Sequence, residues 1–214
     1  RAALGIAVAV CALWLSSPAQ AADTVVDLSG AVPDDGLRHF FIELEVPTGI
    51  KEIEIAHDDL SADNILDWGL LDEKGAFRGW GGGNSENAVV GEAAASRSYL
   101  PGPIGAGKWK IVVGKAKIKQ TPASYSVQVT MRDLATLPPQ TTRTPYKAVA
   151  PLLTETRWYA GDFHVHSIES GDAKPPLDEI AAFAKGRKLD FVMLSDHNTV
   201  SQLDFYSVAQ KQHP

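Results

Sequence analysis

The chain has 214 residues, of which 44% are hydrophobic and 21% are charged, and its formal net charge at pH 7 is −6. This length allows one large domain or two small ones, each with a substantial hydrophobic core. The negative balance, with no cluster of Lys and Arg, argues against a nucleic-acid-binding face.

Residues 1–21 have the pattern of a secretory signal peptide. A single arginine precedes an apolar run over residues 2–15, and residues 19–21 form a small-x-small cleavage pattern. Because the run is short for a membrane span, we expect export to the periplasm or the cell exterior and no span after cleavage. An uncleaved N-terminal anchor and a lipid-modified Cys11 are the alternatives. Cys11 is the only cysteine, so the cleaved chain would form no disulfide.

Residues 22–135 alternate apolar and polar side chains in the manner of antiparallel strands. The alternation is clear from Phe40 to Val46, from Trp109 to Val113 and from Tyr125 to Met131, and a period of two is typical of strands with one buried face. Turn sequences such as Pro-Asp-Asp-Gly at 33–36 separate these runs, and no helical stretch intervenes. We predict an antiparallel β-sandwich that is jelly-roll-like.

Three tryptophans of this region, Trp68, Trp80 and Trp109, are expected in the core or between domains, because large aromatic residues are mostly buried. The alternative is a ligand-binding role. Arg78 and Trp80, beside several glycines, would then form a loop over a neighbouring active site or a surface that binds carbohydrate.

Residues 136–157 have the composition of a linker. They are rich in Thr and Pro and poor in large apolar residues, which favours an extended connector over a packed element. We therefore place a domain boundary here, between the sandwich and an α/β segment at 158–214.

The α/β segment has the pattern of repeated strand–helix units. A strand from Trp158 to His166 precedes a helix that begins near Leu177, with acidic residues in its first turn. We expect this helix to bury four apolar residues, Leu177, Ile180, Phe183 and Ala184. The apolar run at 190–194 predicts a parallel strand buried on both faces, and a second helix is expected over 201–212.

Histidines gather where these two predicted strands end. His164 and His166 share a face of the first strand because side chains at i and i+2 point the same way, and His197 follows the second strand. In a right-handed βαβ unit the carboxyl ends of both strands lie at one edge. Imidazole nitrogen binds zinc, manganese or iron, and the nearby aspartates, Asp162, Asp172 and Asp196, supply oxygen ligands or orient the rings. The sequence thus predicts a divalent metal site.

The stretches Asp162-Phe163-His164-Val165-His166-Ser167, Ser170-Gly171-Asp172 and Ser195-Asp196-His197-Asn198-Thr199 resemble the first two motifs of the PHP (polymerase and histidinol phosphatase) superfamily. The resemblance implies a metal-dependent hydrolase on a distorted β/α barrel, with two or three divalent ions.

By this resemblance, His164 and His166 match the pair that binds one metal ion, and His197 and Asp172 match ligands of another. Asp162 and Asp196 match acidic positions of the motifs. Asp162 is expected behind the ligands, where it orients them, and Asp196 is the candidate catalytic carboxylate.

The aromatic and glycine-rich stretches at 65–72, 77–84, 99–104 and 107–109 are similar to the N-terminal region of secreted PHP enzymes of the CehA/McbA type, a branch named for carbamate hydrolases. This implies that a metal-bound hydroxide attacks a small phosphoester, or a carbamate or carboxylic ester. The alternative function is a secreted β-sandwich binding module for a glycan or surface polymer, with a non-catalytic PHP remnant.

A barrel of this kind needs on the order of 200 residues or more, whereas the α/β segment spans residues 158–214. We expect a C-terminally truncated piece of a longer protein, with an incomplete metal site and little activity. The first residue is Arg rather than Met, which also indicates that the start of the reading frame is missing.

Overall fold

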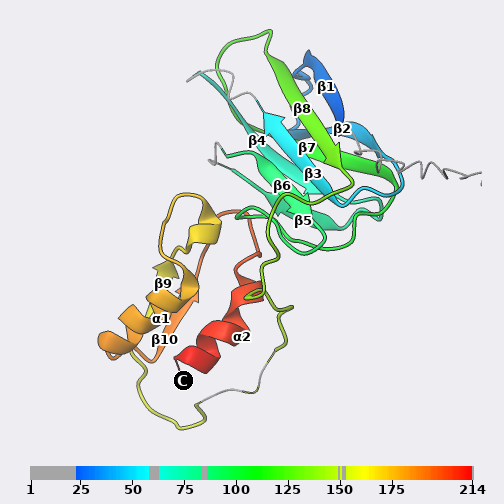
Figure 1. The fold of residues 1–214 in the computed structure, drawn as a ribbon. Helices are drawn as coiled ribbons and strands as arrows, with labels where there is room; N and C mark the ends of the chain where they lie inside the picture. The colour runs from blue at the N-terminus through cyan, green and yellow to red at the C-terminus, as the bar shows by residue number, and fades with distance from the viewer. Residues whose placement is uncertain (1–22, 58–62, 83–85, 149, 151–152, 214) are drawn as a thin grey trace, which may run out of the picture.

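The computed structural model describes residues 23–213, except residues 58–62, 83–85, 149 and 151–152. The predicted signal peptide, residues 1–21, lies outside the described residues. Figure 1 shows a lobe built of β-strands and a smaller lobe in which helices lie beside two short strands. Of the helices in this part of the chain, none combines the length and the apolar character needed to cross a membrane.

The larger lobe is a β-sandwich. Over the described residues its strands are β1 (Thr24–Ala31), β2 (His39–Val46), β3 (Glu52–His57), β4 (Asn64–Leu71), β5 (Phe77–Trp80), β6 (Ala88–Gly91), β7 (Gly107–Ile118) and β8 (Ser124–Arg132). They form two four-stranded antiparallel sheets, ordered β1-β8-β3-β6 and β2-β7-β4-β5. Eight strands joined in this order make a jelly roll. The predicted antiparallel sandwich is confirmed.

The side chains of β2 show why this sequence folds into a sandwich. Ile42, Leu44 and Val46 are buried, whereas Glu43 and Glu45 between them are exposed. Successive side chains of a strand point to opposite faces, so β2 has one apolar face that packs against the other sheet. Each large apolar side chain buried in this way contributes about 1.5–3 kcal/mol to stability.

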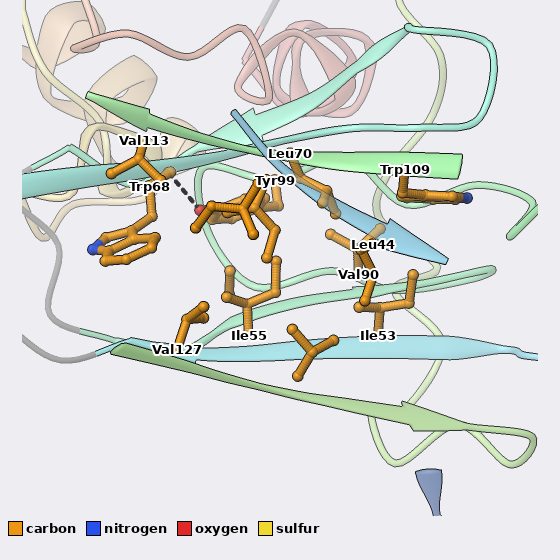
Figure 2. Close-up of a cluster of buried hydrophobic side chains, with 14 of the residues drawn as sticks. Leu44, Ile53, Ile55, Trp68, Leu70, Val90, Tyr99, Trp109, Val113 and Val127 are labelled. Carbon is orange, nitrogen blue, oxygen red and sulfur yellow. Dashed lines mark hydrogen bonds between the residues drawn. The ribbon is translucent and has the colours of Figure 1, made fainter. Parts of the chain in front are cut away.

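Two tryptophans lie at the centre of this core. Trp68 of β4 and Trp109 of β7 are fully buried and face Ile53 and Val127 of the opposite sheet (Figure 2). The hydroxyl of Tyr99 donates a hydrogen bond of 2.9 Å to the carbonyl oxygen of Trp68. The expectation of buried tryptophans is therefore met at both positions.

Arg78 is also buried, so its side chain offers no surface to a ligand, contrary to the alternative that gave it a binding role. Its guanidinium group donates hydrogen bonds to the carbonyl oxygens of Leu100 (3.2 Å), Gly102 (3.0 Å) and Pro103 (3.0 Å). It also lies 5.3 Å from the ring centroid of Trp109. The side chain thus holds the turn at 100–103 against the sandwich, because each carbonyl needs a donor once it leaves water.

Trp80 is only half-buried, and its ring lies against glycines of two neighbouring strands. A Cβ atom added at Gly114 would lie 2.7 Å from the ring, and one added at Gly69 would lie 2.6 Å from it. The ring therefore packs closely on the sheet where these two residues have no side chain.

The smaller lobe contains one parallel strand pair with a helix between its strands. Its elements are β9 (Gly161–Val165), the 3-10 helix η1 (Ile168–Ser170), α1 (Leu177–Gly186), β10 (Phe191–Leu194) and α2 (Leu203–Gln212). β9 and β10 pair in parallel, with Gly161 opposite Phe191 and Val165 opposite Leu194. Both carboxyl ends therefore lie at the same edge.

Two burial predictions for this lobe are wrong. Phe183 is 62% exposed, although Ile180 and Ala184 on the same helix are buried. It lies at the edge of an open cavity that Ile180 also lines, and the guanidinium of Arg187 is 5.2 Å from its ring. Met193 is 48% exposed. Its neighbour Val192 and Ile180 of α1 line one cavity, so Met193 points to the other face of the sheet.

The predicted linker forms no helix or strand among its described residues, yet part of it packs against the sandwich. The side chain of Gln140 accepts a hydrogen bond from the backbone nitrogen of Ala95 (3.1 Å) and donates one to its carbonyl oxygen (2.9 Å). These paired bonds fix the path of the chain as it passes from the sandwich to the smaller lobe.

Candidate metal centre

The end of β9 brings two imidazole rings together. His164 lies within the strand and His166 follows it, so both rings lie on one side. Their Nε2 atoms are 3.1 Å apart. Two nitrogen lone pairs at this distance repel each other unless a proton or a cation lies between them.

Asp172 returns to this pair after the short helix η1. Gly171, in the left-handed conformation with φ of 84°, ends η1 and reverses the chain. The Asp172 carboxylate oxygens then lie 3.1 and 3.2 Å from Nδ1 of His166. The same carboxylate lies 3.4 Å from Nε2 of His197, which follows β10. Candidate ligand atoms of His166, Asp172 and His197 all lie within 4.8 Å of one another.

The electrostatics of Asp172 suit a cation ligand. A hydrogen bond from the side chain of Ser170 lowers the pKa of Asp172 from its ordinary value. Burial opposes this shift, but the interactions with His166 and His197 add to the lowering and the net direction is downward. The carboxylate is therefore ionised at neutral pH. It is also exposed, so an ion can reach it.

Two loops carry these ligands, and hydrogen bonds tie the loops together. The carboxylate of Asp196, after β10, accepts bonds from the backbone nitrogen (2.5 Å) and the hydroxyl (2.6 Å) of Ser167, after β9. The backbone nitrogen of His197 donates to the hydroxyl of Ser170 (3.0 Å). In this conformation Asp196 binds one ligand-bearing loop to the other.

Asp162 acts on the backbone of the strand. Its carboxylate accepts a hydrogen bond of 2.9 Å from the backbone nitrogen of His164, which fixes the end of β9. The structure therefore brings together four of the six predicted site residues, His164, His166, Asp172 and His197. The other two carboxylates hydrogen-bond to neighbouring residues: Asp162 to the backbone of His164, and Asp196 to the backbone and hydroxyl of Ser167.

Sequence reasoning missed Glu169, a buried carboxylate between the predicted ligands. It is 5% exposed and hydrogen-bonds to Ser98 of the sandwich, 71 residues away along the chain. No periodicity or motif spacing relates these two positions. The sequence offers one indication of a special role for Glu169, a charged residue between Ser167 and Ser170 in a loop that carries predicted ligands. This indication does not identify Ser98 as the residue that Glu169 contacts.

The donor set fits a divalent cation. Neutral imidazole and carboxylate are ligands of zinc, manganese and iron. Two nitrogens bound tetrahedrally to one zinc ion at about 2.0–2.1 Å lie roughly 3.3 Å apart, close to the observed separation of 3.1 Å between Nε2 of His164 and Nε2 of His166.

The fold and site together define a jelly-roll sandwich joined to a βαβ unit with a cluster of histidines and aspartate at its carboxyl edge. Comparison with known proteins adds no family to this description. The chain matches no protein-family model, and no curated protein matches it.

Proposed function

We propose that the chain carries the metal-binding loops of a metal-dependent hydrolase of the PHP type. The observation that supports this proposal is the convergence of three imidazoles and one ionised carboxylate, from His164, His166, His197 and Asp172, at the carboxyl edge of a parallel strand pair. Enzymes built of β/α units commonly place their chemistry at this edge.

Each side chain has a role in this proposal. His164 and His166 hold one cation through their Nε2 atoms, and Asp172 and His197 contribute to a second. Asp172 also accepts a hydrogen bond from Nδ1–H of His166, and in this tautomer the Nε2 lone pair of the ring is free for a metal ion. A carboxylate behind a ligating histidine fixes the tautomer in this way.

A divalent cation held here lowers the pKa of a bound water toward neutrality and polarises a substrate oxygen. The substrate class that the motif resemblance supports is a small phosphoester, or a carbamate or carboxylic ester. Asp196 remains the predicted catalytic carboxylate. To take a proton from water, one of its oxygens must accept a further hydrogen bond beside those from Ser167.

Metal titration tests the proposal. The metal-stripped protein is titrated with Zn²⁺ or Mn²⁺, and His166→Ala is compared with His39→Ala, which removes an exposed histidine from β2 of the sandwich. We expect His166→Ala to weaken binding by at least about 10–100-fold, the loss that follows removal of even the outer partners of a metal ligand. His39→Ala should bind like the wild type. Equal binding by the wild type and His166→Ala would overturn the proposal.

A second candidate function is glycan binding by the sandwich. The outer face of the sheet β2-β7-β4-β5 has a shallow groove lined by Phe41, Phe77 and Trp80, with Asp67 and Lys115 beside them. Aromatic rings next to polar groups are a common platform for ligands that are apolar on one side and polar on the other. Retarded migration in gels that contain polysaccharide, lost in Phe77→Ala, would favour this function. Unchanged migration of the wild type in a panel of polysaccharides would count against it.

A further inference from the structure

A buried polar cluster lies where the sandwich meets the smaller lobe. It consists of Ser98 from the sandwich, Arg143 from the connecting segment, and Glu169, Thr199 and Ser201 from the smaller lobe. All five side chains are almost completely shielded from solvent. Polar groups in such a place are costly unless they are paired, so their partners reveal what the contact specifies.

Glu169 is the centre of this cluster. One of its carboxylate oxygens accepts hydrogen bonds from the backbone nitrogen of Ser98 (2.9 Å) and from the hydroxyl of Ser201 (2.6 Å). The guanidinium of Arg143 lies 3.8 Å from the same oxygen. The negative charge of Glu169 is thus balanced within the contact.

Ser98 of the sandwich reaches both ligand-bearing loops. Its hydroxyl donates to the carbonyl oxygen of Glu169 (2.5 Å), in the loop after β9, and its own carbonyl accepts from the hydroxyl of Thr199 (3.1 Å), in the loop after β10. Ser98 adopts a left-handed conformation with φ of 70°, which is uncommon for serine. This conformation turns its backbone and side chain toward the smaller lobe.

Arg143 adds a third connection from the linker. It donates a hydrogen bond of 3.0 Å to the carbonyl oxygen of Tyr99 and lies 3.5 Å from the carboxylate of Asp204 in α2. Arg143 therefore joins the turn that carries Ser98 to the helix that follows the second ligand-bearing loop.

These contacts lie within a few residues of the candidate ligands. Glu169 is three residues from both His166 and Asp172, and Thr199 is two residues from His197. A displacement of Glu169 or Thr199 would move ligand atoms that must meet within a few tenths of an ångström.

We infer that the β-sandwich is a positioning domain for the metal centre and that Glu169 is the positioning residue through which it holds the ligand-bearing loops. This inference rests on the metal site proposed above. A contact that served only to attach two lobes could be apolar, because apolar burial alone supplies adhesion. A cluster of directional hydrogen bonds instead selects one arrangement of the two lobes.

The test uses Co²⁺, whose visible absorption bands report the geometry of its ligands. Four metal-stripped proteins are titrated with Co²⁺: the wild type, Glu169→Ala, Glu169→Gln and Ser98→Gly. Glycine at position 98 tolerates the positive φ, so this variant removes the hydroxyl without adding backbone strain. Ser96→Ala is the control, because the hydroxyl of Ser96 bonds with Val89 inside the sandwich.

We expect Glu169→Ala to bind Co²⁺ about 10–100-fold more weakly than the wild type, because removal of a group that orients metal ligands typically costs this much affinity. The absorption bands of the bound Co²⁺ should also shift. Glu169→Gln, which keeps one acceptor oxygen, should recover part of the affinity, and Ser98→Gly should show a smaller loss. Ser96→Ala should match the wild type. Wild-type affinity and bands in both Glu169→Ala and Ser98→Gly would overturn the inference.

Hydrogen exchange separates this inference from the metal proposal. In the metal-free protein, Glu169→Ala or Ser98→Gly should speed amide exchange in residues 167–172 and 195–199 and leave β3 and β8 unchanged. If the wild type binds no Co²⁺, the metal proposal fails, and faster exchange in these two loops still supports positioning by the sandwich. Unchanged exchange in both variants would refute it, whatever the metal result.

Discussion

Nδ1 of His166 lies 3.1 Å from the nearer carboxylate oxygen of Asp172. His166 precedes η1 and Asp172 follows it, so this contact connects the two ends of the loop after β9. The same carboxylate lies 3.4 Å from Nε2 of His197, after β10. A carboxylate in this position orients an imidazole and increases its strength as a metal ligand. Asp172 is thus the residue on which both halves of the candidate metal centre depend.

The first prediction is that Asp172→Asn weakens Zn²⁺ binding by about 10–100-fold. The amide keeps the shape of the carboxylate but carries no charge. Because hydrogen bonding with Ser170 and His166 lowers the pKa of Asp172, the wild-type carboxylate is ionised at neutral pH and stays so under mildly acidic conditions. Competition with a chromogenic chelator measures the affinity. Asp178→Asn, at an exposed position in the first turn of α1, is the control, and an equal loss there would contradict the prediction.

The second prediction concerns Glu52, which is 0% exposed in β3. Its carboxylate accepts hydrogen bonds from Arg132 (3.1 Å), from the backbone nitrogen and hydroxyl of Thr136 (3.0 and 2.7 Å) and from the backbone nitrogen of Leu137 (3.0 Å). Glu52→Ala leaves these donors without their acceptor, so we expect the free energy of unfolding to fall by about 3–5 kcal/mol.

Urea denaturation measures this loss. Glu43→Ala is the matched control, since Glu43 is exposed on β2 and forms a surface ion pair of 3.6 Å with Lys108. Such a pair contributes about 0–1 kcal/mol. Similar losses in the two variants would show that the Glu52 contacts do not hold the segment after β8.

The third prediction is that Gly79→Ala destabilises the sandwich by about 1–3 kcal/mol. Gly79 has φ of 137°, and a Cβ atom there would lie 2.5 Å from the carbonyl oxygen of Ser98 and 2.6 Å from Cα of Tyr99. Both are backbone atoms, so they move only if the turn that contacts Glu169 also moves. Thermal unfolding measures the effect.

Gly75→Ala controls for backbone strain in this experiment. Gly75 also has a positive φ, of 77°, but nothing lies within 4 Å of its added Cβ. In Gly75→Ala the free energy of unfolding should therefore fall only by the strain of the left-handed conformation, about 1–2 kcal/mol. Hydrogen exchange in residues 167–172 should increase in Gly79→Ala alone, and an equal increase in both variants would argue against a steric effect on the Ser98 turn.

The fourth prediction is a pH dependence from Asp190, which precedes β10. Its carboxylate accepts two hydrogen bonds from Arg157 (2.7 and 3.0 Å) and one from the backbone nitrogen of Ala160 (2.9 Å). The bonds from Arg157, and then that from Ala160, lower the pKa of Asp190 to about 2. Because the folded pKa is below the ordinary value of about 3.9, the stability from this group is fully present above about pH 4 and is lost as the pH falls toward 2.

The measurement is urea denaturation of the wild type and Asp190→Asn from neutral pH downward. The difference in free energy of unfolding should stay constant above about pH 4 and shrink below it. In an Arg157→Ala background the difference should become smaller at every pH, since the main partner is gone. A difference that grows on acidification would have the wrong sign for this assignment.

Local patterns were enough to predict much of the fold. The alternation in β2, β7 and β8 indicated which side chains point inward, and the inward residues are buried as expected, among them Trp109, Val113 and Val129. The spacing of His164 and His166, with the rule that parallel strands end at one edge, indicated that His197 would lie near them. These inferences succeed because each depends on geometry within one strand or one βαβ unit.

The sequence by itself determined the β-rich first lobe, the βαβ unit and the positions of the candidate ligands, because strand periodicity and short spacings act between neighbours in the chain. Only the tertiary structure decided that Arg78 is buried, that Phe183 and Met193 are exposed, and that Glu169 meets Ser98. Burial depends on which surfaces come together, and partners 71 residues apart are brought into contact by the packing of whole lobes, which no local pattern encodes.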